Sequence, residues 1–198
     1  MDRKFTAPLA AGALLTLALL GVACLYLPYQ RERQLALEIQ RSGGFAEFEF
    51  LGPDWIPTGI QTLLPFWNHI TSVDFSRTPV TGAGLEPLKR LTNLNGLNLS
   101  NTQITDADLE HLKGLTNLNG LELNNTQITD AGLEQLKGLT SLNWMDLSNT
   151  PITDAGLERL KGLTSLNTLF LDERQVTAKS RTSFRKALPS CRLEIVVP

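Results

Sequence analysis

Apolar residues recur through most of the chain with a period of 24 residues. Three consecutive copies run from Leu91 to Gly162, a degraded copy precedes them at Trp67–Arg90, and another follows at Leu163–Lys186. In the first full copy the apolar positions are Leu91, Leu94, Leu97, Leu99, Ile104, Leu109 and Leu112. Self-similarity with a period between about 20 and 50 residues is typical of a solenoid, in which each unit packs against its neighbours.

Each unit begins with the pattern of a short strand, because Leu97 and Leu99 are separated by a single polar residue. One unit cannot fold alone. Burying its apolar side chains contributes about 10–20 kcal/mol, whereas ordering its backbone costs about 24–48 kcal/mol. We therefore expect the strands to stack into a parallel sheet with the helices on the opposite face.

The second half of each unit predicts a short helix. In the first full copy this helix follows Thr105 and Asp106, whose side chains are of the types that cap helix N-termini. The aspartate recurs at positions 106, 130 and 154, and we interpret the recurrence as capping rather than catalysis. Gly114 is expected to end the helix in the left-handed conformation.

The apolar pattern of one unit resembles the leucine-rich repeat. Its positions are Leu94, Leu97, Leu99, Thr102 and Ile104. The following TDAGLExLKG resembles F-box-type repeats and the repeats of bacterial membrane-anchored leucine-rich-repeat proteins. The resemblance covers residues 67–198. It implies an α/β solenoid with a parallel sheet on the concave face, short helices on the convex face and caps at both ends.

The chain departs from the family at the ninth position of the repeat, where an asparagine amide usually bonds the backbone of adjacent turns. Thr78, Thr102, Thr126 and Thr150 stand there, followed by Arg174. A hydroxyl has one donor where an amide has two. Asn101, Asn125 and Asn149, one position earlier, are therefore expected to share the task.

We interpret residues 1–29 as an N-terminal transmembrane anchor, because residues 5–29 are uncharged and span about 37 Å as a helix. A cleaved signal peptide, with Arg3 and Lys4 as its basic residues, is one alternative, although no clean A-x-A cleavage site follows its apolar stretch and apolar residues continue to Tyr29. A lipoprotein acylated at Cys24 is another, although Gly21 stands where that motif has leucine. The anchor places the protein in a bacterial cytoplasmic membrane, and basic residues on both sides leave its orientation open.

Two segments precede the repeats of residues 67–187. Residues 30–44 predict a juxtamembrane helix or linker with Leu35 and Ile39 on one stripe. Residues 45–66 predict the N-terminal cap that a solenoid needs. This cap begins with a strand in which Ala46, Phe48 and Phe50 alternate with glutamates, and we expect its aromatic residues to face the core.

At the other end, a helix is predicted at Ala178–Ala187. Residues 188–198 form a closing strand, because Leu193 and Ile195 fall 24 residues after the apolar pair of the preceding strand. The basic side chains of the helix are Lys179, Arg181, Arg185 and Lys186. They form either a solvated face of the cap or a contact with anionic lipid or an acidic partner.

Composition and motifs give no sign of catalysis. The formal net charge is −2, which does not suggest nucleic-acid binding. His69 and His111 stand in different units without metal-binding spacing, and Cys191 is expected to be a small buried hydrophobe. The sequence contains no phosphate loop, nucleophile elbow or paired-carboxylate motif. We therefore expect neither an enzyme nor a cofactor, a metal or a small-molecule substrate.

The strand positions that point away from the core offer a binding surface. The third position carries Ser72, Gly96, Gly120, Trp144 and Thr168, and the fifth carries Asp74, Asn98, Glu122, Asp146 and Phe170. A solvent-facing tryptophan is a preferred interface anchor. Trp144 and Phe170 are expected to touch across neighbouring strands, unless the C-terminal cap folds over both rings.

The sequence therefore predicts a membrane-anchored, non-catalytic module for binding an unidentified protein. Its contact residues would be Trp144, Phe170, Asp146, Glu122, Asp74 and Asn98. The alternative is a structural spacer of the cell envelope that packs against copies of itself, which the glycines of the central strands would suit. An adapter for ubiquitin transfer rests only on the F-box-type likeness, and no F-box-like segment precedes the repeats.

Overall fold

The computed structural model describes residues 30–50, 61 and 68–197. The described residues divide between two compact units, one that includes residues 30–34 and 49–50 and another of residues 35–48 and 70–197. The second unit holds the solenoid. The predicted anchor at residues 5–29 and most of the predicted cap at 51–66 lie outside the described residues. Within the described ranges, no helix is long and apolar enough to cross a membrane.

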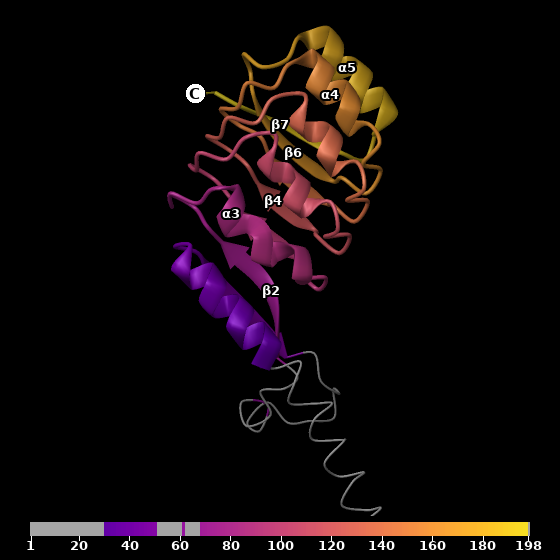
Figure 1. Ribbon diagram of the computed structural model, residues 1–198. Coiled ribbons are helices and arrows are strands. Elements are labelled where there is room, and N and C mark those ends of the chain that lie inside the picture. The colour runs from indigo at the N-terminus through magenta and orange to yellow at the C-terminus, as the bar shows by residue number, and fades with distance from the viewer. Residues whose placement is uncertain (1–29, 51–60, 62–67, 198) are drawn as a thin grey trace, which may run out of the picture. The chain divides into compact units, whose positions relative to one another are not determined.

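The described strands form one seven-stranded sheet in which spatial order follows sequence order (Figure 1). The strands are β1 (Phe45–Phe50), β2 (Asn68–Asp74), β3 (Gly96–Asn98), β4 (Gly120–Glu122), β5 (Trp144–Asp146), β6 (Thr168–Asp172) and β7 (Arg192–Val196). From β2 to β7 every pair is parallel, and each residue is in register with the residue 24 positions later, as Gly96 is with Gly120. The parallel stack and the closing strand are therefore confirmed.

Short helices connect the strands on one side of the sheet. They are α3 (Gly82–Leu85), η2 (Glu86–Arg90), η3 (Asp108–Leu112), η4 (Gly132–Leu136), α4 (Asp154–Leu160) and α5 (Ala178–Ala187). In Figure 1, α4 and α5 lie side by side against the last strands. η2, η3 and η4 are 3₁₀-helices, a form that is common in such short segments. The bounds of α5 match the predicted helix.

The hydrophobic core runs through the solenoid as a single cluster of buried leucines. It also includes Leu35 and Ile39 of the helix at residues 30–41, which are 2% and 0% exposed. A Cβ on Gly44 would lie 2.4 Å from the Phe75 ring. The stripe that we predicted on a linker is therefore packed into the first turn of the solenoid.

The prediction for β1 is only partly correct. The strand forms and Ala46 packs partly against the core, but Phe48 is 46% exposed and Phe45 is 66% exposed. Alternation along a strand specifies which residues share a face. It does not specify whether another element covers that face, so the predicted burial of Phe48 was wrong.

The recurring aspartates join successive units instead of capping their own helices, contrary to our prediction. The Asp106 carboxylate accepts hydrogen bonds from the backbone N–H and hydroxyl of Thr129 in the next unit, at 2.7 and 2.5 Å. Asp130 binds Thr153 in the same way at 2.8 and 2.6 Å. Asp154 and Thr177 repeat the contact with two bonds of 2.8 Å. We call this series the Asp–Thr ladder.

A glycine two residues after the aspartate makes room for this ladder. A Cβ on Gly156 would lie 2.3 Å from Asp130 Oδ1 of the preceding unit. The first unit has Gly82 in place of the ladder aspartate. In the second unit Asp108 instead accepts the Thr105 backbone N–H at 2.7 Å from within the same unit.

The turns after β3, β4 and β5 use the left-handed backbone region. Asn101, Asn125 and Asn149 have φ angles of 57°, 57° and 53°, and asparagine tolerates this conformation better than most residues. Gly114 does not adopt the left-handed conformation. Among the described glycines, only Gly43 has a positive φ. Our prediction of a left-handed glycine at the helix end was wrong.

Candidate functional site

The six predicted contact residues all lie on the concave face, which we define as the third and fifth strand positions opposite the helices. In β3, β4 and β5 the middle residue is buried and its two neighbours are half-buried. The predicted residues are Asp74, Asn98, Glu122, Trp144, Asp146 and Phe170. The structure adds Arg192 and Glu194 of β7, in register with Thr168 and Phe170. Sequence analysis could have found both from the same 24-residue spacing.

Trp144 and Phe170 form an aromatic pair, as predicted. Their ring centroids are 5.6 Å apart and the ring planes are inclined by 57°. Both residues are half-buried, and β7 continues the sheet beside β6 instead of folding over the rings. Because Phe170 packs against the Trp144 ring, it restricts the orientations that the indole can adopt.

Most of the polar side chains at the fifth position have a structural task. One side-chain oxygen of Asp74, Asn98 and Asp146 accepts the backbone N–H two residues further along, at 2.6, 2.9 and 2.8 Å. These bonds support the turn that follows each strand. They also fix the direction in which the side chains project from the concave face.

Glu122 is the exception among the acidic residues of this surface. Its carboxylate makes no hydrogen bond or ion pair with any residue that the structure describes. Partial burial raises the pKa of Glu122 above its usual value, and the like charges of Asp146 and Asp74 raise it further. The concave face therefore holds a carboxylate that lacks a counter-charge and lies near two others.

Beside Glu122 lies a hollow of about 140 Å³, which we call the Trp144 slot. It is lined by Ser72, Gly96, Leu97, Asn98, Gly120, Glu122 and Trp144. A Cβ placed on Gly120 would meet no atom within 4 Å. The slot therefore exists because the strand position next to Trp144 carries no side chain.

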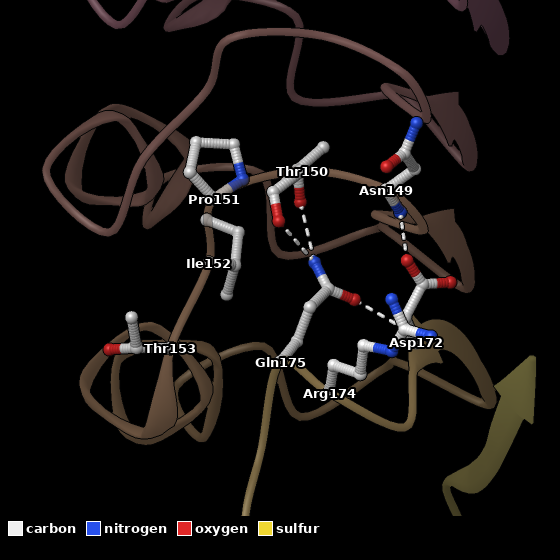
Figure 2. Close-up of a pocket in the computed structure, with 8 residues that line it drawn as sticks. All are labelled: Asn149, Thr150, Pro151, Ile152, Thr153, Asp172, Arg174 and Gln175. Atoms are coloured by element: carbon white, nitrogen blue, oxygen red, sulfur yellow. Dashed lines mark hydrogen bonds between the residues drawn. The ribbon is translucent and has the colours of Figure 1, made fainter. Parts of the chain in front are cut away.

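A second hollow, of about 600 Å³, lies at the last turn of the solenoid (Figure 2). Its polar groups bond one another. The Gln175 amide donates to the carbonyls of Leu147 and Thr150 at 2.9 and 2.7 Å and accepts the Asp172 backbone N–H at 2.5 Å. Asp172 in turn accepts the Asn149 N–H at 2.8 Å. These bonds hold the fifth unit to the fourth, so we assign the hollow a structural role.

Sequence analysis missed Gln175, which bonds the preceding turn as the family asparagine does, but from one position later. In the earlier units the ninth-position threonine bonds within its own unit, as Thr102 does to the Leu99 carbonyl at 2.6 Å. The preceding asparagines supply the turn conformation, and one pair, Asn149 and Asn125, is also hydrogen-bonded. The sequence could have pointed to Gln175, because its amide side chain directly follows Arg174, the ninth-position residue of that unit.

The remaining candidate residues are the basic side chains of α5 and Cys191. Lys179, Arg185 and Lys186 are exposed on α5 and Arg181 is half-buried, so their contact with an anionic surface stays a prediction. Burial raises the pKa of the Cys191 thiol to about 11, which makes it a poor nucleophile. In the part of the chain that is described, no three His, Cys, Asp or Glu residues come together to hold a metal ion.

Comparisons with known proteins agree with the repeat architecture. Residues 92–152 match the family model for the leucine rich repeat. The leucine-rich-repeat ectodomain of the receptor kinase SOBIR1 from Arabidopsis thaliana is 16% identical, over 85% of this chain and 92% of that chain, with a TM-score of 0.51. This likeness supports the fold alone.

Two bacterial structures are also similar over part of their length. A leucine-rich-repeat protein of Leptospira interrogans is 25% identical over 55% of this chain and 27% of that chain, with a TM-score of 0.44. An internalin of Listeria monocytogenes is 27% identical over 55% and 36%, with a TM-score of 0.40. This chain thus matches only about a quarter to a third of those two proteins. A search of curated proteins finds no match.

The matched stretch of residues 92–152 lies inside a stack of parallel strands in 24-residue register. Residues 92–152 are therefore similar to the leucine-rich repeat in both sequence pattern and strand arrangement.

Proposed function

We propose that the chain is a non-catalytic protein-binding module and that its concave face is the contact surface. Leucine-rich-repeat domains generally serve as interaction modules, which supports the general class. The observation that carries the choice of surface is the Trp144–Phe170 pair, whose half-buried rings lie in contact 5.6 Å apart. Aromatic side chains on a rigid scaffold supply contact area at a low entropic cost, and they dominate many protein interfaces.

Peptide selection tests this proposal even though the partner is unidentified. A random peptide library is panned against the full chain in a non-ionic detergent. The selected peptides are then measured against a variant carrying Trp144→Ala and Phe170→Ala. We expect the variant to bind them at least about tenfold more weakly, as for truncated interface anchors.

The matched control is Glu134→Ala on the opposite side of the solenoid. There Glu134 is paired with Lys137 and with Arg159, the latter at 2.9 Å. This variant should bind the peptides as the unchanged chain does. Peptides that bind the folded double variant at full affinity would show that the concave aromatic pair is not the contact surface.

We also propose that residues 5–29 anchor the module in a membrane. The support is the uncharged stretch itself, which suffices to span a bilayer as a helix. Protease treatment of sealed vesicles, with a tag after Pro198, tests the proposal. Protection in right-side-out vesicles and cleavage in inverted ones would place the repeats in the cytoplasm, and the opposite pattern would place them outside. A tag recovered free of the membrane would contradict the anchor.

Self-assembly into a structural spacer of the cell envelope is the second candidate. It is favoured by exposed apolar side chains on the first and last strands or next to them. Phe45 is 66% exposed and Phe48 is 46% exposed on β1, and Val197, just after β7, is 76% exposed. Unpaired strand edges can join copies of a chain. A molecular mass that rises with protein concentration, and no longer does so with Phe45→Lys and Phe48→Lys, would favour this function.

A further inference from the structure

We propose that the Trp144 slot binds one lysine or arginine side chain of the protein partner. The inference rests on the proposed function, because it names the chemistry that the concave face recognises. Three properties of the slot support it: its shape, its charge and the aromatic ring that lines it.

The shape fits a long, unbranched side chain. Gly96 and Gly120 line the hollow of about 140 Å³ without contributing side chains, and Trp144 and Glu122 line it as well. Lysine and arginine have flexible apolar stems that pack along apolar surfaces while the charged group stays at a polar rim.

The charge of the concave face favours a cation. Partial burial raises the pKa of Glu122, and the like charges of Asp146 and Asp74 nearby raise it further. The third and fifth positions of β2 to β6 hold no basic side chain. Arg192, on β7, forms an ion pair with Glu194 of its own strand. An anion would be repelled, and a neutral group would bury Glu122 further without supplying a counter-charge.

The aromatic ring adds an attraction that a carboxylate cluster alone would lack. An ammonium or guanidinium group near the face of a tryptophan is attracted by the electrons of the ring. Trp144 is held by its contact with Phe170, so the partner would not have to order the ring on binding. A cation in the slot could therefore contact Trp144 and Glu122 together.

Side-chain analogues test the slot independently of any partner. The probes are n-butylguanidinium and n-butylammonium, and n-butanol is the neutral control. The ¹⁵N-labelled full chain in a non-ionic detergent is titrated with each, and the indole N–H signal of Trp144 is assigned by its absence in Trp144→Phe. We expect saturable shifts with both cations and at least about threefold weaker binding of n-butanol.

Glu122→Gln should weaken the binding of both cations at least about threefold and leave the binding of n-butanol unchanged. Glu134→Gln, on the other side of the solenoid, should change neither the binding of the cations nor that of n-butanol. If n-butanol binds as well as the cations, or if Glu122→Gln has no effect on them, the slot is not a cation site and the inference is overturned.

A second experiment distinguishes failure of the cation inference from failure of the proposed function. Peptides selected on the concave face should lose affinity when their lysines and arginines are replaced by norleucine. Peptides that depend on the aromatic pair but tolerate norleucine would support the proposed function and overturn the cation inference. Peptides that ignore the Trp144→Ala and Phe170→Ala double variant would contradict the proposed function itself, whatever the analogues do.

Discussion

Gly156→Ala tests whether the Asp–Thr ladder stabilises the solenoid. Gly156 lies inside α4, where helix propensity alone favours alanine by about 1 kcal/mol. The structure predicts the opposite result, because a Cβ at this position would lie 2.3 Å from Asp130 Oδ1 and 2.7 Å from Ile152 Cγ2. To avoid this overlap, Asp130 must withdraw from Thr153.

The expected size of the loss follows from the contacts. Asp130 accepts two hydrogen bonds from Thr153, at 2.8 and 2.6 Å. Bonds to a charged group contribute about 1.5–3 kcal/mol each when buried, and less at a half-exposed site that water can reach. Taking about 1 kcal/mol for each bond, adding about 1–2 kcal/mol for crowding and subtracting the propensity gain of about 1 kcal/mol gives a net destabilisation of about 2–3 kcal/mol.

Urea unfolding of the full chain in a non-ionic detergent, followed by circular dichroism, measures this change. Gly114→Ala is the matched control, because its Cβ would meet nothing within 4 Å and its backbone is not left-handed. The control should be unchanged or stabilised by about 0.4–1 kcal/mol. A Gly156→Ala chain as stable as the unchanged chain would refute the reasoning.

A double-mutant cycle separates the ladder from simple crowding. In a chain that already carries Asp130→Ala, the Gly156→Ala change should cost at least about 1 kcal/mol less than in the unchanged chain, because the carboxylate is gone. Strictly additive effects would show that the Asp130 carboxylate is not what the new methyl group displaces.

Three further predictions concern titration and reactivity. At pH 7, Glu122→Gln should raise the thermal midpoint, because the raised pKa of Glu122 means that folding disfavours its charged form. This gain should disappear near pH 3, where the carboxyl is protonated in both states. The pKa of Asp154 is lowered chiefly by the Thr177 backbone N–H. Its stabilisation is therefore present above the unfolded pKa of about 3.9 and is lost as the pH falls through the folded value, so urea titrations of Asp154→Asn should show less acid destabilisation than the unchanged chain. Cys191 is 5% exposed with a pKa of about 11, and in a Cys24→Ser chain it should react with a thiol reagent at pH 8 only after unfolding. Fast labelling of the folded chain would contradict its burial.

The repeat pattern of the sequence determined the architecture. A fixed spacing of apolar residues places the same side chains at the same point of every turn, so the parallel register could be predicted without coordinates. The closing strand followed from the spacing of Leu193 and Ile195, and the contact of Trp144 with Phe170 followed from their neighbouring strand positions. Each of these depends on position along a regular backbone, which a period specifies.

Only the tertiary structure decided which atoms of successive units meet. The ladder aspartates were expected to cap their own helices, but they bond threonines of the next unit because the stacking of units brings those donors within 2.5–2.8 Å. Gln175 bonds the preceding turn from an unexpected position, and Phe48 is exposed where alternation predicted burial. The Trp144 slot likewise depends on the space beside Gly120, which the sequence does not measure. Hydrogen bonds and hollows depend on ångström-scale distances between units, and a repeat period specifies the order of those units but not these distances.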